Sequence, residues 1–202
     1  MSLPLLADLP ATLQPLVSRH AAALRAALTA DDGPGLDGWT EQRWAEFARV
    51  AAASEFVLEQ SLREPAMLHA LVTSGELDRA FSAGELCAQV AAAAQAATSE
   101  DELARNLRRQ RTRQQVRIIW RDLTRQADLV QTCRDLSDLA DAAIDEAYQR
   151  LYPRHCQQFG TPIGHRSGQP QHMVVLGMGK LGAVELNLSS DIDLIFAYPE
   201  GG

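Results

Sequence analysis

The sequence predicts a predominantly α-helical protein: a helical bundle followed by a strand, a short helix and a second strand that begin an incomplete α+β domain. Up to about Tyr152, apolar residues recur at three- and four-residue spacing, and no segment shows the two-residue period of a strand. After residue 172, two β-branched runs flank a glycine-containing turn. We therefore expect a helical region (1–152), a connector (153–172) and the start of a second domain (173–202).

The composition excludes several classes of protein. The 202 residues carry 19 basic and 26 acidic side chains, a net charge of −7, and Lys180 is the single lysine. An acidic chain is a poor general binder of nucleic acid. No uncharged apolar stretch reaches the ~20 residues of a membrane span, and the N-terminus lacks the basic and apolar regions of a secretory signal. We expect a cytoplasmic protein with neither nucleic acid nor membrane as a partner.

Caps and breakers delimit the first helices. One helix is expected from near Pro10 to the break at Asp31–Gly35. Thr40 can cap a second helix, and Ser54 can begin a third that ends before Pro65. Two further helices are expected, over residues 66–72 and 82–97.

Two longer helices follow. Ser99, with Glu102 three residues later, is a capping box that predicts the start of a long helix. Ser137 can cap the last helix, and Pro153 is expected to stop it. The long helix should bury one stripe, formed by Val116, Trp120, Leu123 and Ala127.

Arginine recurs every four residues from Arg105 to Arg125. Residues 101–125 hold eight arginines against three acidic residues, whereas the next 25 residues hold six acidic residues against two arginines. No aromatic residues are interleaved as in a nucleic-acid site, so we expect a solvated face with pairing between helices. A docking face for an acidic protein partner remains open.

The glycine-rich segment after the connector allows two interpretations. Strands are expected at Met173–Leu176 and Ile192–Tyr198, with a short helix near residues 180–186 between them. Gly177, Gly179 and Gly182 match a dinucleotide fingerprint, which makes a dinucleotide-binding enzyme one alternative. However, the gap before the second strand is too short for a parallel crossover, which needs a dozen or more residues.

The other interpretation starts from Asp191 and Asp193. Alternate residues on a strand point to one face, with their roots roughly 7 Å apart, so the two carboxylates can share a divalent metal. Such hard oxygen ligands suit Mg²⁺, which neutralises phosphate oxygens in phosphoryl and nucleotidyl transfer. The glycines let backbone amides approach phosphate, and Lys180 can add a positive charge.

Three strings in this region carry a family resemblance: residues 177–182, Glu185-Leu186-Asn187, and residues 189–196. Together they resemble the polymerase-β-type nucleotidyltransferase motif of the bifunctional glutamine synthetase adenylyltransferases, which add AMP to a tyrosine of glutamine synthetase and remove it. Phe159-Gly160-Thr161-Pro162 and the arginine-rich helix also resemble the region before that motif. The similarity extends from about Phe56 to the end of the sequence.

The resemblance implies a function and a site. It assigns this half of the enzyme to the Mg²⁺-dependent, phosphorolytic removal of AMP, which gives ADP. Asp191 and Asp193 would be the catalytic metal ligands. Contacts to the nucleotide (ATP, ADP or AMP) and to phosphate would come from Gly177, Gly179, Lys180, Gly182 and Ser190. The partners implied are glutamine synthetase and a PII-type signal protein, in the regulation of nitrogen metabolism.

Two features depart from a complete family member. Ala183-Val184 replaces a pair that is commonly Gly followed by Gly or Arg, which bears on the phosphate contact. The superfamily also needs a third carboxylate on a later strand, and only nine residues follow Asp193. We therefore expect an N-terminal part of a longer enzyme that is inactive alone. A helical interaction module without chemistry remains an alternative function.

Overall fold

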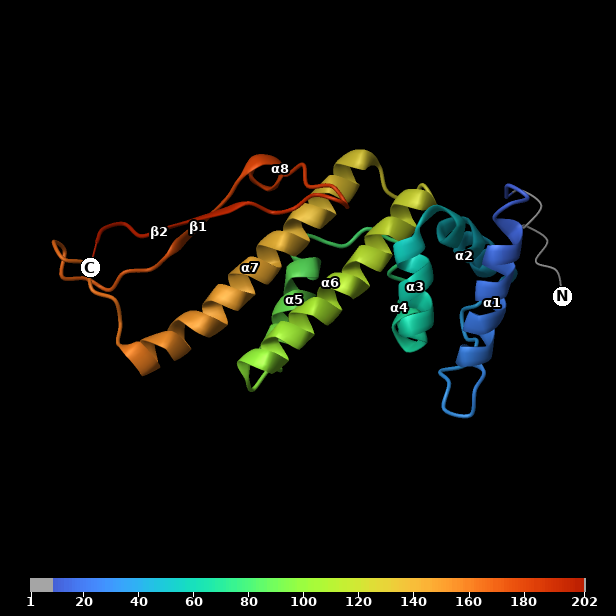
Figure 1. The fold of residues 1–202 in the computed structure, drawn as a ribbon, viewed down its shortest axis with the longest axis horizontal. Coiled ribbons are helices and arrows are strands. Elements are labelled where there is room, and N and C mark those ends of the chain that lie inside the picture. The colour runs from blue at the N-terminus through green and yellow to red at the C-terminus, as the bar shows by residue number, and fades with distance from the viewer. Residues whose placement is uncertain (1–8, 202) are drawn as a thin grey trace. The chain divides into compact units, whose positions relative to one another are not determined.

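The structure is a computed structural model that describes residues 9–201, and the fold class predicted from the sequence is confirmed. Over this range the chain forms eight helices and a two-stranded antiparallel sheet (Figure 1). In the same range, none of the helices combines the length and apolar character needed to cross a bilayer. The elements in chain order are α1 (Gln14–Leu28), α2 (Glu41–Ala53), α3 (Glu55–Arg63), α4 (Pro65–Thr73), α5 (Glu85–Gln95), α6 (Glu100–Leu123), α7 (Leu129–Phe159), β1 (Val174–Gly177), α8 (Gly179–Gly182) and β2 (Leu194–Ala197).

The chain divides into two compact units. The first comprises the residues up to Phe81 together with Thr112–Thr132, and the second comprises Ser82–Arg111 together with the chain from Cys133 onward. The long helices α6 and α7 therefore contribute residues to both units. The domain boundaries predicted at residues 152 and 172 stay a prediction.

Aromatic side chains form the centre of the first unit. The ring centroids of Trp39 and Trp44 lie 4.5 Å apart, and those of Phe47 and Trp120 lie 6.4 Å apart. Phe47 and Trp120 are fully buried, so α6 contributes one of the largest side chains of this core. Apolar residues of α1, α3 and α4 complete the cluster, including Leu24, Leu28, Val57, Leu68 and Leu71.

The predicted N-caps of α2, α3 and α6 are confirmed. Thr40 Oγ1 accepts from the Arg43 amide at 3.2 Å, Ser54 Oγ from the Val57 amide at 3.3 Å, and Ser99 Oγ from the Glu102 amide at 3.2 Å. The Glu102 carboxylate accepts from the amide and hydroxyl of Thr98, one residue before the cap. These two bonds hold the pKa of Glu102 below its usual value.

Two predictions about the last long helix are wrong. Helix α7 begins at Leu129, where Asp128 Oδ1 accepts from the Gln131 amide at 2.8 Å, so Ser137 lies inside the helix. Pro153 also lies inside it, and the helix continues to Phe159. Proline removes one helical donor and costs roughly 3 kcal/mol. Contacts beside it favour the helix: Tyr152 Oη donates to the Gln171 carbonyl at 2.7 Å, and Arg154 donates to the Thr98 carbonyl at 3.2 Å.

The arginine row is only partly solvated, which corrects the expectation of a solvated face. Arg117 is fully buried and Arg121 is 2% exposed. Arg117 Nε donates to the Glu76 carbonyl at 3.1 Å and Nη2 to the Arg79 carbonyl at 2.8 Å. Its guanidinium also stacks on Phe81, 3.4 Å from the ring centroid. Arg117 therefore holds the segment after α4 against α6 within the first unit, whereas Arg121 Nη2 donates to the Gln126 carbonyl at 2.9 Å.

The first strand lies one residue later than predicted, the second is shorter than predicted, and the two pair antiparallel. Val174 lies opposite Ala197 and Gly177 lies opposite Leu194. Because β1 has four residues, only four residues of the second strand find a partner. The backbone next to the ladder adds one bond, in which the Met178 amide donates to the Asp193 carbonyl at 2.9 Å.

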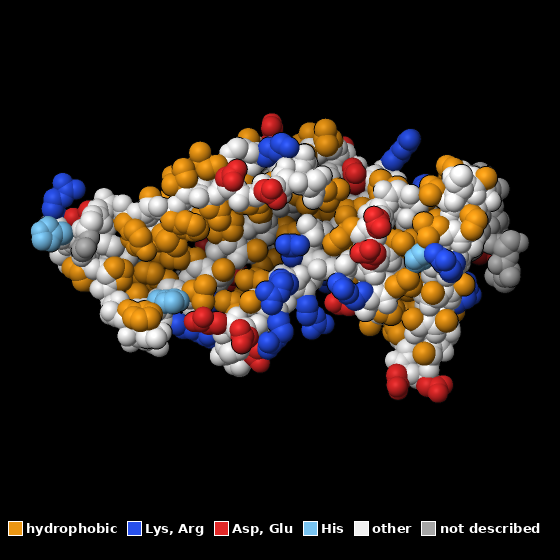
Figure 2. All heavy atoms as spheres, in the orientation of Figure 1, with side chains coloured by type: hydrophobic (Ala, Val, Ile, Leu, Met, Phe, Trp, Pro, Cys, Tyr) orange, Lys and Arg blue, Asp and Glu red, His pale blue; other side chains and the backbone are white. Residues whose placement is uncertain are grey.

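We refer to β1, β2 and the segment between them as the hairpin. The hairpin lies along α7 within the second unit (Figure 1). The Met173 amide donates to Tyr148 Oη at 3.0 Å, and the Leu186 amide donates to Ser137 Oγ at 3.3 Å. Several hairpin side chains are nevertheless exposed, among them Phe196 at 58%, and Figure 2 shows hydrophobic side chains gathered over this part of the surface. The strands thus present apolar residues on both faces, as their sequences predict.

Candidate functional site

Residues 177–182, which we call the glycine turn, join β1 to α8 by close backbone packing. A Cβ on Gly182 would lie 2.4 Å from the Gly177 carbonyl oxygen, and a Cβ on Gly177 would lie 3.0 Å from the Leu181 side chain. Gly179 has φ +54° and open space where a Cβ would point. Packing therefore explains the glycines at 177 and 182, and backbone conformation explains the glycine at 179.

The turn after α8 is a Schellman motif with an unusual residue at its left-handed position. The Val184 amide donates to the Leu181 carbonyl at 3.0 Å, and the Glu185 amide donates to the Lys180 carbonyl at 2.8 Å. Val184 has φ +60°, a conformation that glycine normally supplies and that strains a β-branched residue. The strain falls on the pair Ala183-Val184, where the sequence departs from the family pattern.

The predicted metal ligands precede β2 instead of lying within it. Asp191 and Asp193 are both exposed, in a segment that enters the strand at Leu194. The bond between the Met178 amide and the Asp193 carbonyl places this segment beside the glycine turn. We call residues 191–193 the Asp-x-Asp segment. The structure thus brings the Asp-x-Asp segment and the glycine turn to one end of the hairpin.

Lys180 and Ser190, both predicted to contact nucleotide, are joined to each other. Lys180 Nζ donates to Ser190 Oγ at 3.2 Å, and Ser190 Oγ donates to Asn187 Oδ1 at 2.6 Å. We refer to these three side chains as the Lys180–Ser190–Asn187 relay. Asn187 was not among the predicted site residues, although it ends the Glu185-Leu186-Asn187 string that carries part of the resemblance.

The residues present fit part of a magnesium site. Two exposed carboxylates on alternate residues supply hard oxygen ligands, and Mg²⁺ is commonly held by one or two carboxylates together with substrate phosphates. Within residues 9–201, no group of three or more His, Cys, Asp or Glu side chains is arranged to hold a metal ion. The carboxylates of Asp191 and Asp193 could therefore supply part of a ligand set, which substrate oxygens or further protein ligands would complete.

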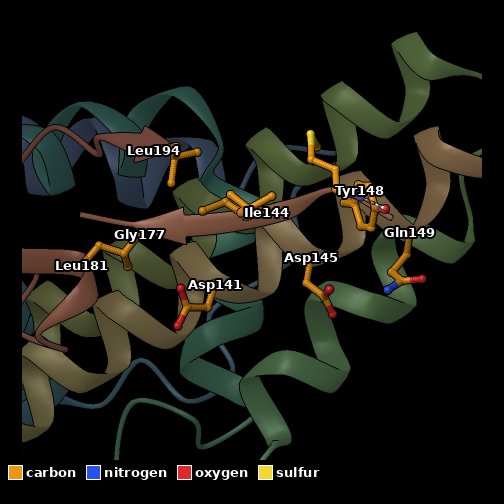
Figure 3. Close-up of a pocket in the computed structure, with 10 residues that line it drawn as sticks. Asp141, Ile144, Asp145, Tyr148, Gln149, Gly177, Leu181 and Leu194 are labelled. Atoms are coloured by element: carbon orange, nitrogen blue, oxygen red, sulfur yellow. Dashed lines mark hydrogen bonds between the residues drawn. The ribbon is translucent and has the colours of Figure 1, made fainter. Parts of the chain in front are cut away.

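A cleft of about 280 Å³ lies between α7 and the hairpin (Figure 3). Asp141, Asp145 and Gln149 line its α7 side, while Gly177 and Leu181 line the side of the glycine turn. Burial, with a smaller contribution from the charge of Asp138, raises the pKa of Asp141. Two carboxylates on one wall repel phosphate, so we assign no nucleotide phosphate to this cleft.

The antiparallel pairing argues against the dinucleotide interpretation. A dinucleotide fingerprint belongs to a parallel βαβ unit with a full crossover helix. In the structure, β1 and β2 are antiparallel and α8 has four residues. The match of Gly177, Gly179 and Gly182 to that motif is therefore a coincidence of spacing.

Comparison with known proteins confirms the resemblance. The family model described as glutamate-ammonia ligase adenylyltransferase matches residues 44–202. The chain is 71% identical to a protein of Pseudomonas putida, 66% to one of Pseudomonas syringae pv. tomato and 62% to one of Pseudomonas aeruginosa. Each is named a bifunctional glutamine synthetase adenylyltransferase/adenylyl-removing enzyme, and each match covers 100% of this chain and 21% of the relative. The chain therefore spans about a fifth of these relatives' length, and it belongs to the glutamate-ammonia ligase adenylyltransferase family.

Proposed function

We propose that the full-length protein controls glutamine synthetase by adding and removing AMP, and that this chain contributes the first part of the AMP-removing site. The observation that carries the proposal is the juxtaposition of the glycine turn and the Asp-x-Asp segment at one end of the hairpin. The Met178–Asp193 backbone bond and the Lys180–Ser190 contact hold the two together. The names of the relatives support the choice of glutamine synthetase as substrate.

The proposed reaction is phosphorolysis of the tyrosyl-AMP ester. An oxygen of inorganic phosphate attacks the AMP phosphorus, the bond from that phosphorus to the tyrosine oxygen breaks, and ADP forms. The tyrosine oxygen leaves as a phenolate and takes up a proton. Mg²⁺ held by Asp191 and Asp193 would neutralise the charge of the phosphate oxygens.

This chain's own groups bind and orient the substrates. Lys180 Nζ has three protons, of which Ser190 accepts one, so two can be donated to phosphate oxygens. The open space above Gly179 lets phosphate approach the backbone at the start of α8. Gly177 and Gly182 maintain the turn that places Lys180 beside the Asp-x-Asp segment.

The wider assignments follow from the resemblance. We propose that ATP is the AMP donor in the opposite reaction, that a PII-type signal protein is a second partner, and that the protein acts in the cytoplasm in the regulation of nitrogen metabolism. The alternative of a helical docking module is weakened within the first unit, because Arg117 and Arg121 are buried there.

The test uses the full-length protein with adenylylated glutamine synthetase, phosphate and Mg²⁺, and measures ADP release. Asp191→Asn and Asp193→Asn should each abolish the release, because each substitution removes a metal-binding charge. Asp141→Asn is the matched control: it removes a carboxylate from the neighbouring cleft and should leave the rate within twofold of wild type. Unchanged rates in both site variants would remove these residues from the site.

A further inference from the structure

We propose that Asn187 is a positioning residue: through Ser190 it sets the location of the Asp191 carboxylate for metal binding. The inference rests on the proposed function, because it concerns the same metal site. It adds a residue and a role that follow from three contacts of the loop between α8 and β2.

The direction of the relay follows from the hydrogen-bonding capacity of its members. A serine hydroxyl has one proton to donate and two lone pairs to accept with, whereas an ammonium group only donates. The Lys180 ammonium therefore donates to Ser190, and Ser190 donates its one proton to the Asn187 carbonyl oxygen, at 2.6 Å. The positive charge at one end polarises the hydroxyl and strengthens its bond to Asn187.

The loop is anchored on both sides of this relay. On one side, Leu186 is buried at 6% exposure and its amide donates to Ser137 of α7. On the other side, the Asp193 carbonyl accepts from Met178. Between these anchors, the Ser190 amide donates to the Asn187 carbonyl at 3.2 Å, so backbone and side chain of Asn187 close the same turn.

Asp191 is the first residue after that closed turn. Its neighbour Ser190 is held by a backbone bond and a side-chain bond to Asn187 and by a contact from Lys180. A metal ligand must be held within about 0.5 Å of its productive position, and loss of an outer partner commonly lowers metal affinity 10- to 100-fold. Asn187 is exposed, so truncating it alters this network without opening a core.

The test compares three variants of the full-length protein: Asn187→Ala, which removes the acceptor oxygen; Asn187→Asp, which keeps an oxygen at the same place; and Ser189→Ala, a control in the same loop. Manganese binding is titrated by electron paramagnetic resonance, and AMP removal is measured against Mg²⁺ concentration. Thermal unfolding is recorded for each variant.

We expect Asn187→Ala to weaken Mn²⁺ binding, and to raise the Mg²⁺ concentration for half-maximal rate, by about tenfold. The thermal midpoint should not change. Asn187→Asp and Ser189→Ala should stay within twofold of wild type. Wild-type metal dependence in Asn187→Ala, or an equal defect in Asn187→Asp, overturns the proposal, as does a lowered midpoint with unchanged metal dependence.

The metal titration separates this proposal from the proposed function. If the wild-type protein binds Mn²⁺ through Asp191 but does not remove AMP, the proposed function fails, while the effect of Asn187→Ala on Mn²⁺ binding still decides the positioning role. If Asp191→Asn does not change Mn²⁺ binding, both fail.

Discussion

Arg117 in the first unit and Lys180 in the second are both cations that donate to oxygen atoms of a neighbouring loop, yet they differ in burial. Arg117 is fully buried between two backbone carbonyls and an aromatic ring. Lys180 is exposed and donates to one hydroxyl. The guanidinium is committed to the fold, whereas the ammonium retains protons that a ligand can accept.

The chemistry of the two side chains matches these positions. Arginine is planar and carries five donors, so it can satisfy two carbonyls and stack on Phe81 at once. A buried charge is tolerated only when its donors are satisfied in this way. Lysine is a compact, strongly hydrated charge and suits an exposed position. Substitution of Arg117 should therefore affect stability, and substitution of Lys180 should affect function.

The largest expected effect is that of Arg117→Ala. It leaves the Glu76 and Arg79 carbonyls without this donor and opens a cavity, so unfolding should become easier by about 3 kcal/mol. Urea unfolding followed by tryptophan fluorescence reports this unit. Arg49→Ala, at an exposed position of α2 in the same unit, should change stability by less than about 0.5 kcal/mol. Equal effects in the two variants would contradict the burial argument.

Gly182→Ala should come next. Its Cβ would lie 2.4 Å from the Gly177 carbonyl oxygen, so the backbone of the turn must move, at a cost of about 2 kcal/mol. Faster hydrogen exchange of the Met178 amide, which bonds to Asp193, would report the loosened turn. Gly201→Ala, with open space at its Cβ, should leave that exchange rate unchanged. Wild-type exchange in Gly182→Ala would refute the packing role.

Val184→Gly should increase stability. Glycine relieves about 1–2 kcal/mol of left-handed strain but loses roughly 0.5–1 kcal/mol more entropy on folding, so the net gain should be about 0.5 kcal/mol. Slower exchange of the Glu185 amide, which closes the Schellman motif, would show the gain. Val184→Ala retains most of the strain and should gain less. A faster exchange in the glycine variant would mean that this turn is unstrained.

Lys180→Ala tests the other cation of the comparison. Because Lys180 is exposed, we expect its loss to change stability by less than about 0.5 kcal/mol. In the full-length protein it should nevertheless lower the rate of AMP removal at least tenfold, through loss of the charge that we propose binds phosphate. A destabilisation as large as that of Arg117→Ala, or a wild-type rate, would remove the distinction between the two cations.

The smallest effect concerns pH at the start of α6. Bonds from Thr98 lower the pKa of Glu102, so its contribution to stability is present above the ordinary glutamate pKa and is lost as pH falls through the lowered value. Thr98→Ala removes the hydroxyl and should move the pKa of Glu102 upward in an NMR titration, whereas Thr98→Ser should keep it low. An unshifted titration in Thr98→Ala would assign the effect to other groups.

The sequence predicted those features that depend on neighbours along the chain. Thr40, Ser54 and Ser99 cap helices because each hydroxyl reaches an amide three residues later, whatever the rest of the molecule does. The glycine turn and Asp191 were predicted as site residues for a similar reason, since the residue types and their spacing make up a recognisable motif.

Features that depend on distant residues were missed. Ser137 caps no helix, because its hydroxyl donates to Cys133 and accepts from Leu186, 49 residues later. Pro153 did not stop α7, and contacts of the residues on either side of it lie far along the chain. The Asn187–Ser190 contact spans only three residues and is local, whereas the Lys180–Ser190 contact spans ten and required the path of the loop.

Local patterns thus predicted the helical class, the order of the elements and the family, because period, caps and motif spacing depend on residues close together in the chain. Only the fold shows that Arg117 is buried, that α7 continues past Pro153 and that Ser137 accepts from the Leu186 amide. Burial and long-range hydrogen bonds depend on which segments meet in space, and no pattern of neighbouring residues encodes that meeting.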